Sequence, residues 1–460
     1  MTSSTPGPQR GKPRLRPIGI VAAAALVAGL SMLLRPSPPA APPAPSVAGG
    51  SSAGSATLLE NAPPDDLAAI DDELRLWVPK ADADARDDLS AGTVSLLYLG
   101  RGRITGDAGD YERALAAADR AVHANPTSTG TQALKATVLQ ATHDFTGALT
   151  LAESILTTEP ENVDALAVAG DAKLELGRLD EAGATYARIE KLLPGPALDA
   201  REARLAWLRG DAATAMRLAT RARDAAAEST TSDPSFYEAQ LGEMARLTGD
   251  ATMARAAYEG ALAMRPSNQL AMLGLARLDA FAGDDAAAIT QLRKAAAIAP
   301  RPETLGLLVD LLARTGATTE AAGDAATIHA IEGLGGTSAQ LFDRQISLFD
   351  LDHGDATTAV SDRLKAAATV RPDAPGLDLV GWAAYRLGDL ATARRESDRA
   401  LATGSIDARI LYHAGAIRIA AGDAAGGHAF VRRALALGPA LDPLDRAGAE
   451  DLVQGLPPAG

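Results

Sequence analysis

The chain has 460 residues, of which 47% are hydrophobic but only 3% aromatic, so its apolar side chains are mainly aliphatic. This composition favours closely packed helices over aromatic-rich sheets. The absence of cysteine excludes disulfides, thiolate metal sites and cysteine nucleophiles, and the formal net charge of −14 argues against a general nucleic-acid binder.

The amino-terminal residues have the pattern of a membrane segment. Four basic residues between positions 10 and 16 precede an uncharged run over residues 17–34. As a helix this run would be about 27 Å long, close to the thickness of a hydrocarbon core. The basic flank predicts a transmembrane or signal-anchor helix, with residues 1–16 as a cytoplasmic tail and the remaining chain outside the membrane.

Two other interpretations of this segment stay open. It is a signal peptide if cleavage follows the small residues Ser46-Val47-Ala48, which would release a secreted protein. It is an ordinary buried helix if it packs inside a soluble fold. The high content of Ala, Gly, Arg and Asp suggests a bacterial source. The anchor interpretation therefore places the protein in a bacterial cell membrane, with its body outside the cytoplasm.

The next two segments are expected to be a spacer and a cap. Residues 35–57 combine closely spaced prolines, which impose extended backbone, with glycines and serines that loosen it. Such a stretch buries too little apolar surface to fold. Residues 58–92 are expected to cap the folded region with an amphipathic helix. The apolar residues at helical spacing in it are Leu67, Ile70, Leu74 and Trp77.

A repeat with a period near 34 residues occupies residues 93–439 and predicts a stacked array of helix pairs. Each of about ten units carries a glycine, or once a histidine, that is usually followed by aspartate. These anchor positions are Gly109, His143, Gly177, Gly210, Gly249, Gly283, Gly316, Gly354, Gly388 and Gly422. The glycine is expected to supply the left-handed backbone that ends the first helix, and the aspartate to cap the second.

Small and helix-breaking residues keep fixed distances from the anchors. Alanine stands five places after nine of the ten anchors, and glycine or alanine seven places before eight of them, which predicts two helices in close contact. Proline ends the second helix in six units. Two longer units lack it, and we expect extended loops around residues 228–235 and 333–339. Residues 440–460 are expected to form a closing helix and tail.

The clearest copy of the unit runs from Leu166 to Pro194. In this pattern the array resembles the tetratricopeptide repeat family over roughly residues 93–439, although the aromatic residue that often opens the first helix is sometimes replaced, as by Glu238. The resemblance implies an all-α fold of about ten antiparallel helix pairs, stacked into a right-handed superhelical solenoid. It also implies that the first helices form a concave face that binds peptides or proteins.

Family geometry places certain first-helix positions on that concave face, among them Arg103 and Glu243. We take the aromatic and arginine residues at such positions as candidate partner-binding residues, because these types anchor many interfaces. The candidates are Arg204, Trp207, Arg277, Trp382, Tyr385 and Tyr412. The last three are expected to form one aromatic cluster, and the first two another. The alternative is that these side chains only fill gaps between helices. The Lys/Asn clamp by which some family members grip a terminal carboxylate is missing.

No catalytic or cofactor-binding pattern accompanies the repeats. The chain has no HExxH, no GxxxxGK[ST] phosphate loop and no GxSxG nucleophile turn. Its six histidines form no dense ligand cluster, although His413 and His428 lie on the two helices of the last unit. We therefore predict no enzyme activity, no cofactor, no metal site and no nucleic-acid partner.

These observations predict a non-enzymatic scaffold that binds a peptide or protein partner in its concave groove, at the outer face of a bacterial membrane. Two alternatives stay open. One is an accessory component of an envelope enzyme, or a component that binds a solute or glycan. The other is a structural protein that self-assembles through an exposed end of the array.

Overall fold

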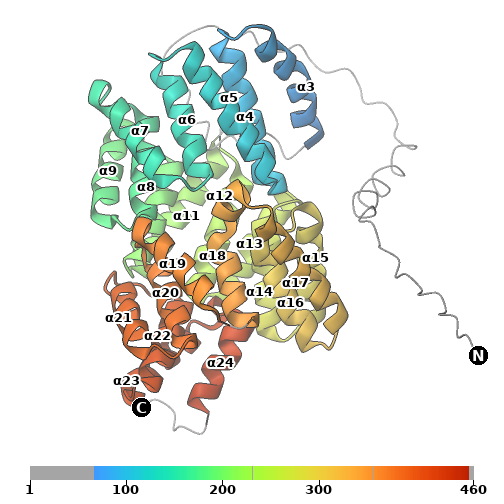
Figure 1. Ribbon diagram of the computed structural model, residues 1–460, viewed down its shortest axis with the longest axis vertical. Coiled ribbons are helices and arrows are strands. Elements are labelled where there is room, and N and C mark those ends of the chain that lie inside the picture. The colour runs from blue at the N-terminus through green and yellow to red at the C-terminus, as the bar shows by residue number, and fades with distance from the viewer. Residues whose placement is uncertain (1–66, 230–231, 355, 455–460) are drawn as a thin grey trace, which may run out of the picture. The chain divides into compact units, whose positions relative to one another are not determined.

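The computed structural model describes residues 67–229, 232–354 and 356–454, so the predicted tail, membrane helix and spacer (residues 1–57) lie outside the described residues. Over these ranges the chain forms twenty-two α-helices and one short 3-10 helix, with no strand (Figure 1). The all-α prediction is confirmed. No helix in the described part of the chain is both long and apolar enough to cross a bilayer.

Ten consecutive helix pairs, here called units 1 to 10, make up the array. Units 1 to 5 are α4 (Asp88–Thr105) with α5 (Ala108–Ala124), α6 (Thr129–Ala141) with α7 (Phe145–Thr158), α8 (Val163–Glu175) with α9 (Leu179–Leu192), α10 (Pro196–Leu208) with α11 (Ala212–Glu228), and α12 (Pro234–Leu247) with α13 (Ala251–Met264). Units 6 to 10 are α14 (Gln269–Ala282) with α15 (Asp285–Ile298), α16 (Pro302–Arg314) with α17 (Thr318–Gly333), α18 (Gly336–His353) with α19 (Thr358–Val370), α20 (Ala374–Arg386) with α21 (Leu390–Leu401), and α22 (Ala408–Ala420) with α23 (Ala424–Ala436).

Both ends of the array are covered by a further helix. At the start, α3 (Leu67–Ala83) buries Ile70 and Leu74 in one cluster with Val94 of α4. At the end, the 3-10 helix η1 (Gly438–Ala440) leads into α24 (Pro443–Val453), which buries Ala449. The expected boundary at residue 93 falls inside α4, and the expected boundary at residue 440 falls at the end of η1.

The turn inside most units has the predicted left-handed glycine. Seven of the anchor glycines have φ between 75° and 90°: Gly177, Gly210, Gly249, Gly283, Gly316, Gly388 and Gly422. His143 takes the same conformation, with φ of 63°, as the one positive-φ residue other than glycine in the described chain. Left-handed backbone costs an L-residue roughly 1–2 kcal/mol, which explains why glycine predominates at this position.

The predicted aspartate caps are also present. In six units the aspartate after the anchor accepts a hydrogen bond of 2.8–3.1 Å from the backbone N–H three residues later. The six caps are Asp144, Asp211, Asp250, Asp284, Asp389 and Asp423. Each one satisfies a donor at the start of the second helix that would otherwise lack a partner within the helix.

Units 1 and 8 depart from the predicted register. In unit 1 the left-handed residue is Gly106, with φ of 69°, and Asp107 is the cap. Gly109 therefore lies in the first turn of α5, which begins earlier relative to its buried alanines than the other second helices. In unit 8, Gly354 is extended, with φ of −109° and ψ of −179°, and Thr357 caps α19. The expected buried Ala359 is consequently exposed.

Of the two expected long loops, the first separates two helices as predicted and the second is absent. At residues 228–235, α11 continues to Glu228 and α12 begins at Pro234. The prediction of a loop at residues 333–339 was wrong, because only Leu334 and Gly335 separate α17 from α18. The additional residues of that unit lengthen α18 to 18 residues.

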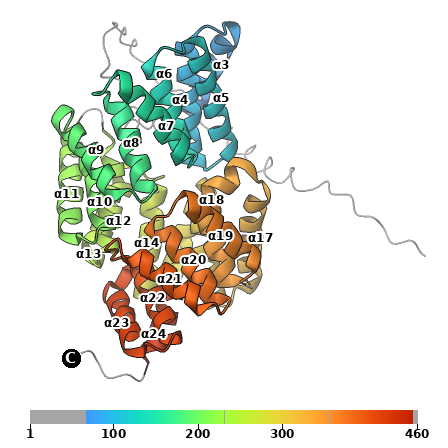
Figure 2. The ribbon, with the colours of Figure 1, turned by 60° about the vertical axis from the view of Figure 1, so that its left-hand side comes forward.

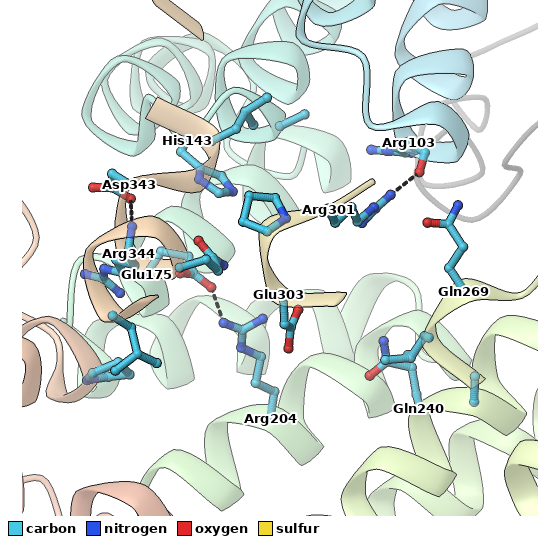
Figure 3. Close-up of a pocket in the computed structure, with 18 of the residues that line it drawn as sticks. Arg103, His143, Glu175, Arg204, Gln240, Gln269, Arg301, Glu303, Asp343 and Arg344 are labelled. Atoms are coloured by element: carbon cyan, nitrogen blue, oxygen red, sulfur yellow. Dashed lines mark hydrogen bonds and ion pairs between the residues drawn. The ribbon is translucent and has the colours of Figure 1, made fainter. Parts of the chain in front are cut away.

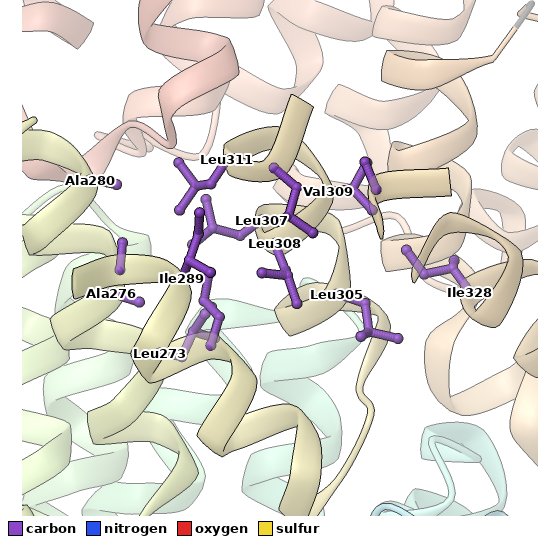
Figure 4. Close-up of a cluster of buried hydrophobic side chains, with 14 of the residues drawn as sticks. Leu273, Ala276, Ala280, Ile289, Leu305, Leu307, Leu308, Val309, Leu311 and Ile328 are labelled. Carbon is purple, nitrogen blue, oxygen red and sulfur yellow. The ribbon is translucent and has the colours of Figure 1, made fainter. Parts of the chain in front are cut away.

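Small side chains allow the two helices of each unit to pack closely. Eight of the nine predicted alanines are at most 7% exposed: Ala114, Ala148, Ala182, Ala215, Ala254, Ala288, Ala321 and Ala393. Where the first helix offers a glycine, the second often places a tyrosine over it. A Cβ at Gly242 would lie 2.7 Å from the ring of Tyr258. Between neighbouring units, aliphatic side chains form the core, as in the cluster around Leu308 and Leu311 (Figure 4).

Units that are six apart in sequence touch each other through their connections. A Cβ at Gly106, in the turn of unit 1, would lie 3.5 Å from the Cβ of Ala299, just before unit 7. At Gly177, in unit 3, it would lie 3.2 Å from the Cα of Asp373, before unit 9. A Cβ at Gly210, in unit 4, would overlap the carbonyl oxygen of Gly404, before unit 10.

Unit 5 makes the same kind of contact with the segment that follows unit 10. The later units make no such contact, because no unit lies six places after them. A Cβ at Gly249 would lie 3.3 Å from the carbonyl oxygen of Leu437, just before η1 and α24. The turn glycines of units 6, 7, 9 and 10 would meet nothing within 4 Å. One superhelical turn therefore takes six units, and the second turn lies directly on the first. In Figure 2 the red carboxy-terminal helices lie next to the green helices of units 4 and 5.

Candidate functional site

The interior of the superhelix contains a cavity of about 1050 Å³. Residues from the first helix of every unit, α4 through α22, line it together with the start of α24. These helices form the concave face that the family resemblance implies. Because the second superhelical turn lies on the first, this face surrounds an interior space rather than a shallow groove.

Many charged side chains lie in the wall of the cavity, among apolar ones. Nine arginines line it: Arg103, Arg201, Arg204, Arg265, Arg277, Arg301, Arg344, Arg371 and Arg409. Eleven carboxylates also line it: Asp171, Glu175, Asp233, Glu303, Asp310, Asp343, Asp352, Asp378, Asp407, Asp442 and Asp445. Such a wall suits a polar or charged segment, since an apolar ligand would strip water from these groups without replacing their hydrogen bonds.

Most of the cavity arginines are held by carboxylates. Six pairs have N···O distances of 2.5–3.2 Å: Arg201–Asp171, Arg204–Glu175, Arg265–Asp233, Arg277–Asp442, Arg344–Asp373 and Arg409–Asp445. Arg371 also pairs with Glu175. Arg103 and Arg301 are the two cavity arginines that form no ion pair with a described residue.

Glu175 joins the two superhelical turns across the cavity wall. It accepts from Arg204 of unit 4 at 2.5 Å (Figure 3). It also pairs with Arg371, which follows α19 in unit 8. Burial alone would raise the pKa of Glu175, but the two guanidinium groups outweigh it and hold this pKa below the usual value. The carboxylate therefore stays ionised and ties segments that are 196 residues apart.

The carboxy-terminal segment closes one end of the cavity through its own carboxylates. The side chain of Asp442, just before α24, accepts from Nε of Arg277 at 2.8 Å. Burial would raise its pKa, but Arg277 and Arg409 lower it to about 2. For Asp445 burial prevails, and it raises the pKa to about 6 although Arg409 and His413 oppose it. Charge pairing thus fixes the start of α24 in the concave face.

The predicted aromatic cluster forms, with one additional member. The Trp382 ring lies 4.9 Å from Tyr385 and 5.8 Å from Tyr412, measured between ring centroids. His413 stacks on Trp382 at 3.9 Å and forms a 2.8 Å hydrogen bond with Asp378. Trp382 is only 5% exposed, and none of the three predicted aromatic residues lines the cavity. They fill the space between the helices, and a role in partner binding stays a prediction.

The other predicted site residues reach the cavity or a pocket beside it. Arg204 and Arg277 line the cavity. Arg204 and Trp207 also line a side pocket of about 270 Å³ with the apolar residue Met244. The indole Nε1 of Trp207 is buried and has no hydrogen-bond partner in the part of the chain that the structure describes. The sequence thus identified these side chains, and their contact with a partner stays a prediction.

Sequence reasoning missed Arg301 and His353 as cavity residues. Arg301 lies in the connection before α16, outside the first-helix positions that the family geometry indicates. His353, the last residue of α18, bonds to Asp310 at 2.6 Å. Both are placed by features that a single unit does not reveal, namely the six-unit spacing and the additional length of α18. Within the described residues no group of His, Asp and Glu is arranged to hold a metal ion.

A sequence model described as tetratricopeptide repeat matches residues 139–205, from the end of α6 to α10. Similar solved structures include PilW, a type IV pilus biogenesis factor, at 19% identity over 46% of this chain and 98% of that chain, with a TM-score of 0.38. A tetratricopeptide repeat protein from Parabacteroides merdae matches at 16% identity over 51% and 91%, with a TM-score of 0.37. Human IFIT1, in a dimer with PPP-AAAA, matches at 13% identity over 80% and 87%, with a TM-score of 0.45. No curated protein matches the chain.

The fold first shows the structural class of the chain. Helix pairs of near-constant length that stack in one direction make the chain an α-helical repeat protein. The family match shows tetratricopeptide repeats over residues 139–205, and the register of glycine, aspartate and alanine continues the same pattern in most other units. Proteins of this fold are scaffolds for protein–protein interaction.

Proposed function

We propose that this chain is a non-enzymatic scaffold that binds a peptide segment of a partner protein inside its superhelix. The observation that carries the proposal is the single cavity lined by the first helices of all ten units. Its wall presents arginines, carboxylates and amides, which are the groups that recognise a polar peptide by hydrogen bonds and ion pairs. A volume of about 1050 Å³ is at the upper end of the range for sites that enclose a ligand.

The proposal is tested by obstructing the cavity with a bulky side chain and comparing the proteins that are labelled near the variant and near the wild type. Gln240 of α12 points into the cavity (Figure 3), so Gln240→Trp should obstruct it. Arg217→Trp, on the exposed face of α11, is the matched control. Proximity labelling in native cells should lose specific proteins with Gln240→Trp and keep them with Arg217→Trp, provided that both variants retain the wild-type circular dichroism spectrum. Identical labelling by all three chains would contradict the proposal.

The location of this scaffold is a second part of the proposal. The basic flank and the uncharged run at residues 17–34 support a body held outside a bacterial cell membrane, with residues 35–57 as its spacer. Protease added to spheroplasts should digest the repeat body while leaving a cytoplasmic marker intact. Protection of the body, or its recovery in the soluble fraction of lysed cells, would contradict this location.

A solute- or glycan-binding component of the cell envelope is the second candidate, and the hydrogen-bonding side chains in the cavity wall favour it. Native mass spectrometry of the purified chain distinguishes the two functions. A co-purifying small molecule that is absent from the Gln240→Trp variant would support solute binding. Loss of a labelled protein partner with the same variant would support the scaffold.

A further inference from the structure

Two arginines of the cavity differ from the other seven in having no carboxylate. Arg103 belongs to α4 and Arg301 to the connection before α16, and both line the cavity. Among the described residues neither forms an ion pair, whereas each of the other seven does. Carboxylates are not scarce in this chain, since it has 58 acidic against 44 basic residues. The unpaired state of these two arginines is therefore a local feature of the site.

The fold holds the Arg301 side chain against the backbone of Arg103. Nη2 of Arg301 donates a 2.5 Å hydrogen bond to the carbonyl oxygen of Arg103 (Figure 3). Ala299, two residues before Arg301, packs against Gly106, so the six-unit contact fixes both backbones. Nε of Arg301 is buried and has no hydrogen-bond partner in the described chain. The side chain of Arg103 forms no hydrogen bond with a described residue.

This arrangement is electrostatically unfavourable without a further group. Both guanidinium groups are half-buried in the cavity wall, where less water solvates them and no carboxylate of the described chain takes its place. Burial lowers the pKa of Arg103, and the only group that opposes this is the phenol of Tyr111. Glu303 is the acidic residue nearest to Arg301 in the sequence, but its carboxylate accepts a 2.8 Å hydrogen bond from Arg277. The wall thus leaves a positive charge that a bound anion would neutralise.

We propose that Arg103 and Arg301 bind an oxyanion of the carboxylate or phosphate class inside the cavity. Guanidinium groups present N–H donors in a planar fork that matches both kinds of oxyanion. Tyr111 lies beside both arginines, and its pKa is raised by burial, so it stays a neutral hydroxyl donor. This proposal rests on the proposed function, because the oxyanion would be carried by the segment or solute that enters the cavity.

Two sources of the oxyanion share this chemistry. One is the side-chain carboxylate of an acidic residue in a bound peptide, and the other is a phosphate group. Calorimetric titration of the full-length chain with succinate and with inorganic phosphate, at constant ionic strength, separates them. We expect saturable binding of at least one anion, and the tighter one identifies the source.

Three variants make the titration specific. Arg103→Met and Arg301→Met should each weaken the binding by about tenfold or more, the loss expected for one charged hydrogen-bonding partner. Arg217→Met removes an exposed arginine of α11 that forms no ion pair with a described residue, and this variant should bind as the wild type does. Arg103→Met is the safer variant for folding, because the Arg301 side chain also donates to a backbone carbonyl across the six-unit contact.

The outcomes divide clearly. Binding that is lost with Arg103→Met and kept with Arg217→Met supports the site. The absence of saturable binding of either anion, or equal binding by Arg103→Met and wild type, overturns it. A failed anion site would leave the scaffold proposal standing if Gln240→Trp still abolishes partner labelling, so the two proposals fail separately.

Discussion

At the scale of single residues, the glycines of the intra-unit turns have two separate duties. All of them except Gly354 supply left-handed backbone, but only glycines of the first superhelical turn also touch a later unit. Gly210 and Gly388 illustrate the difference, since their φ angles are 82° and 81°. A Cβ at Gly210 would overlap the carbonyl oxygen of Gly404, whereas a Cβ at Gly388 would meet nothing within 4 Å.

This contrast predicts unequal effects of the same substitution. Gly388→Ala should destabilise the protein by roughly 1–2 kcal/mol, the cost of left-handed backbone for an L-residue. Gly210→Ala should cost about 1–3 kcal/mol more, because the methyl group forces the second superhelical turn away. Urea denaturation of the two variants measures the difference. Equal free energies of unfolding would show that units 4 and 10 do not touch.

Asp442 makes the stability of the carboxy-terminal end depend on pH. Its pKa lies at about 2, below the usual value of 3.8, so its pairing with Arg277 contributes above pH 4 and is lost as the pH falls towards 2. Asp442→Asn should therefore cost about 2 kcal/mol at pH 7. The difference from wild type should shrink between pH 4 and pH 2. A deficit that stays constant over this range would mean that the carboxylate charge is not responsible.

At the scale of helices, the sequence predicted the regular parts well. These parts are the aspartate caps, the left-handed turns and the buried alanines. Each depends on contacts within one unit, so the 34-residue repeat of the sequence is enough to predict them. The exceptions occurred where an adjustment in helix length replaced the expected turn or loop. In unit 1, Gly106 took the role expected of Gly109, and in unit 8 the residues of an expected loop lengthened α18.

The helix α24 packs against the last units, and the residues just before it also contact units 5 and 6. It contributes Ala449 to the cluster around Trp382 and Tyr412, while Asp442 pairs with Arg277. Repeat arrays transmit most of their stability between neighbours, so removal of a terminal helix should act locally.

A chain that ends at Leu437 should consequently show faster amide hydrogen exchange in α22 and α23, and unchanged exchange in α6 to α9. A chain that ends at Gln454 is the matched control, because it keeps α24 entire. Exchange that rises equally throughout the array would contradict the local role of this cap, and so would exchange that changes nowhere.

At the scale of the whole molecule, the site depends on contacts that no single unit encodes. Arg103 is on a first helix and was among the concave positions implied by the family geometry, but Arg301 lies in a connection. The two meet because unit 7 lies on unit 1, and that follows from the number of units in one superhelical turn. Each step between units contributes a small rotation, and a sequence repeat of 34 residues does not state its size.

The spacing of six units is thus the central structural claim, and an engineered disulfide tests it most directly. The chain has no cysteine, so Gly106→Cys with Ala299→Cys introduces the only thiols. The two Cβ atoms would lie 3.5 Å apart, within the range of a disulfide. Gly283→Cys with Ala299→Cys is the control, since Gly283 shares the left-handed backbone and a Cβ there would meet nothing within 4 Å. Under mild oxidation, non-reducing electrophoresis should show an internal cross-link in the first variant only. No cross-link in that variant, or an equal one in the control, would contradict a superhelix in which unit 7 lies on unit 1.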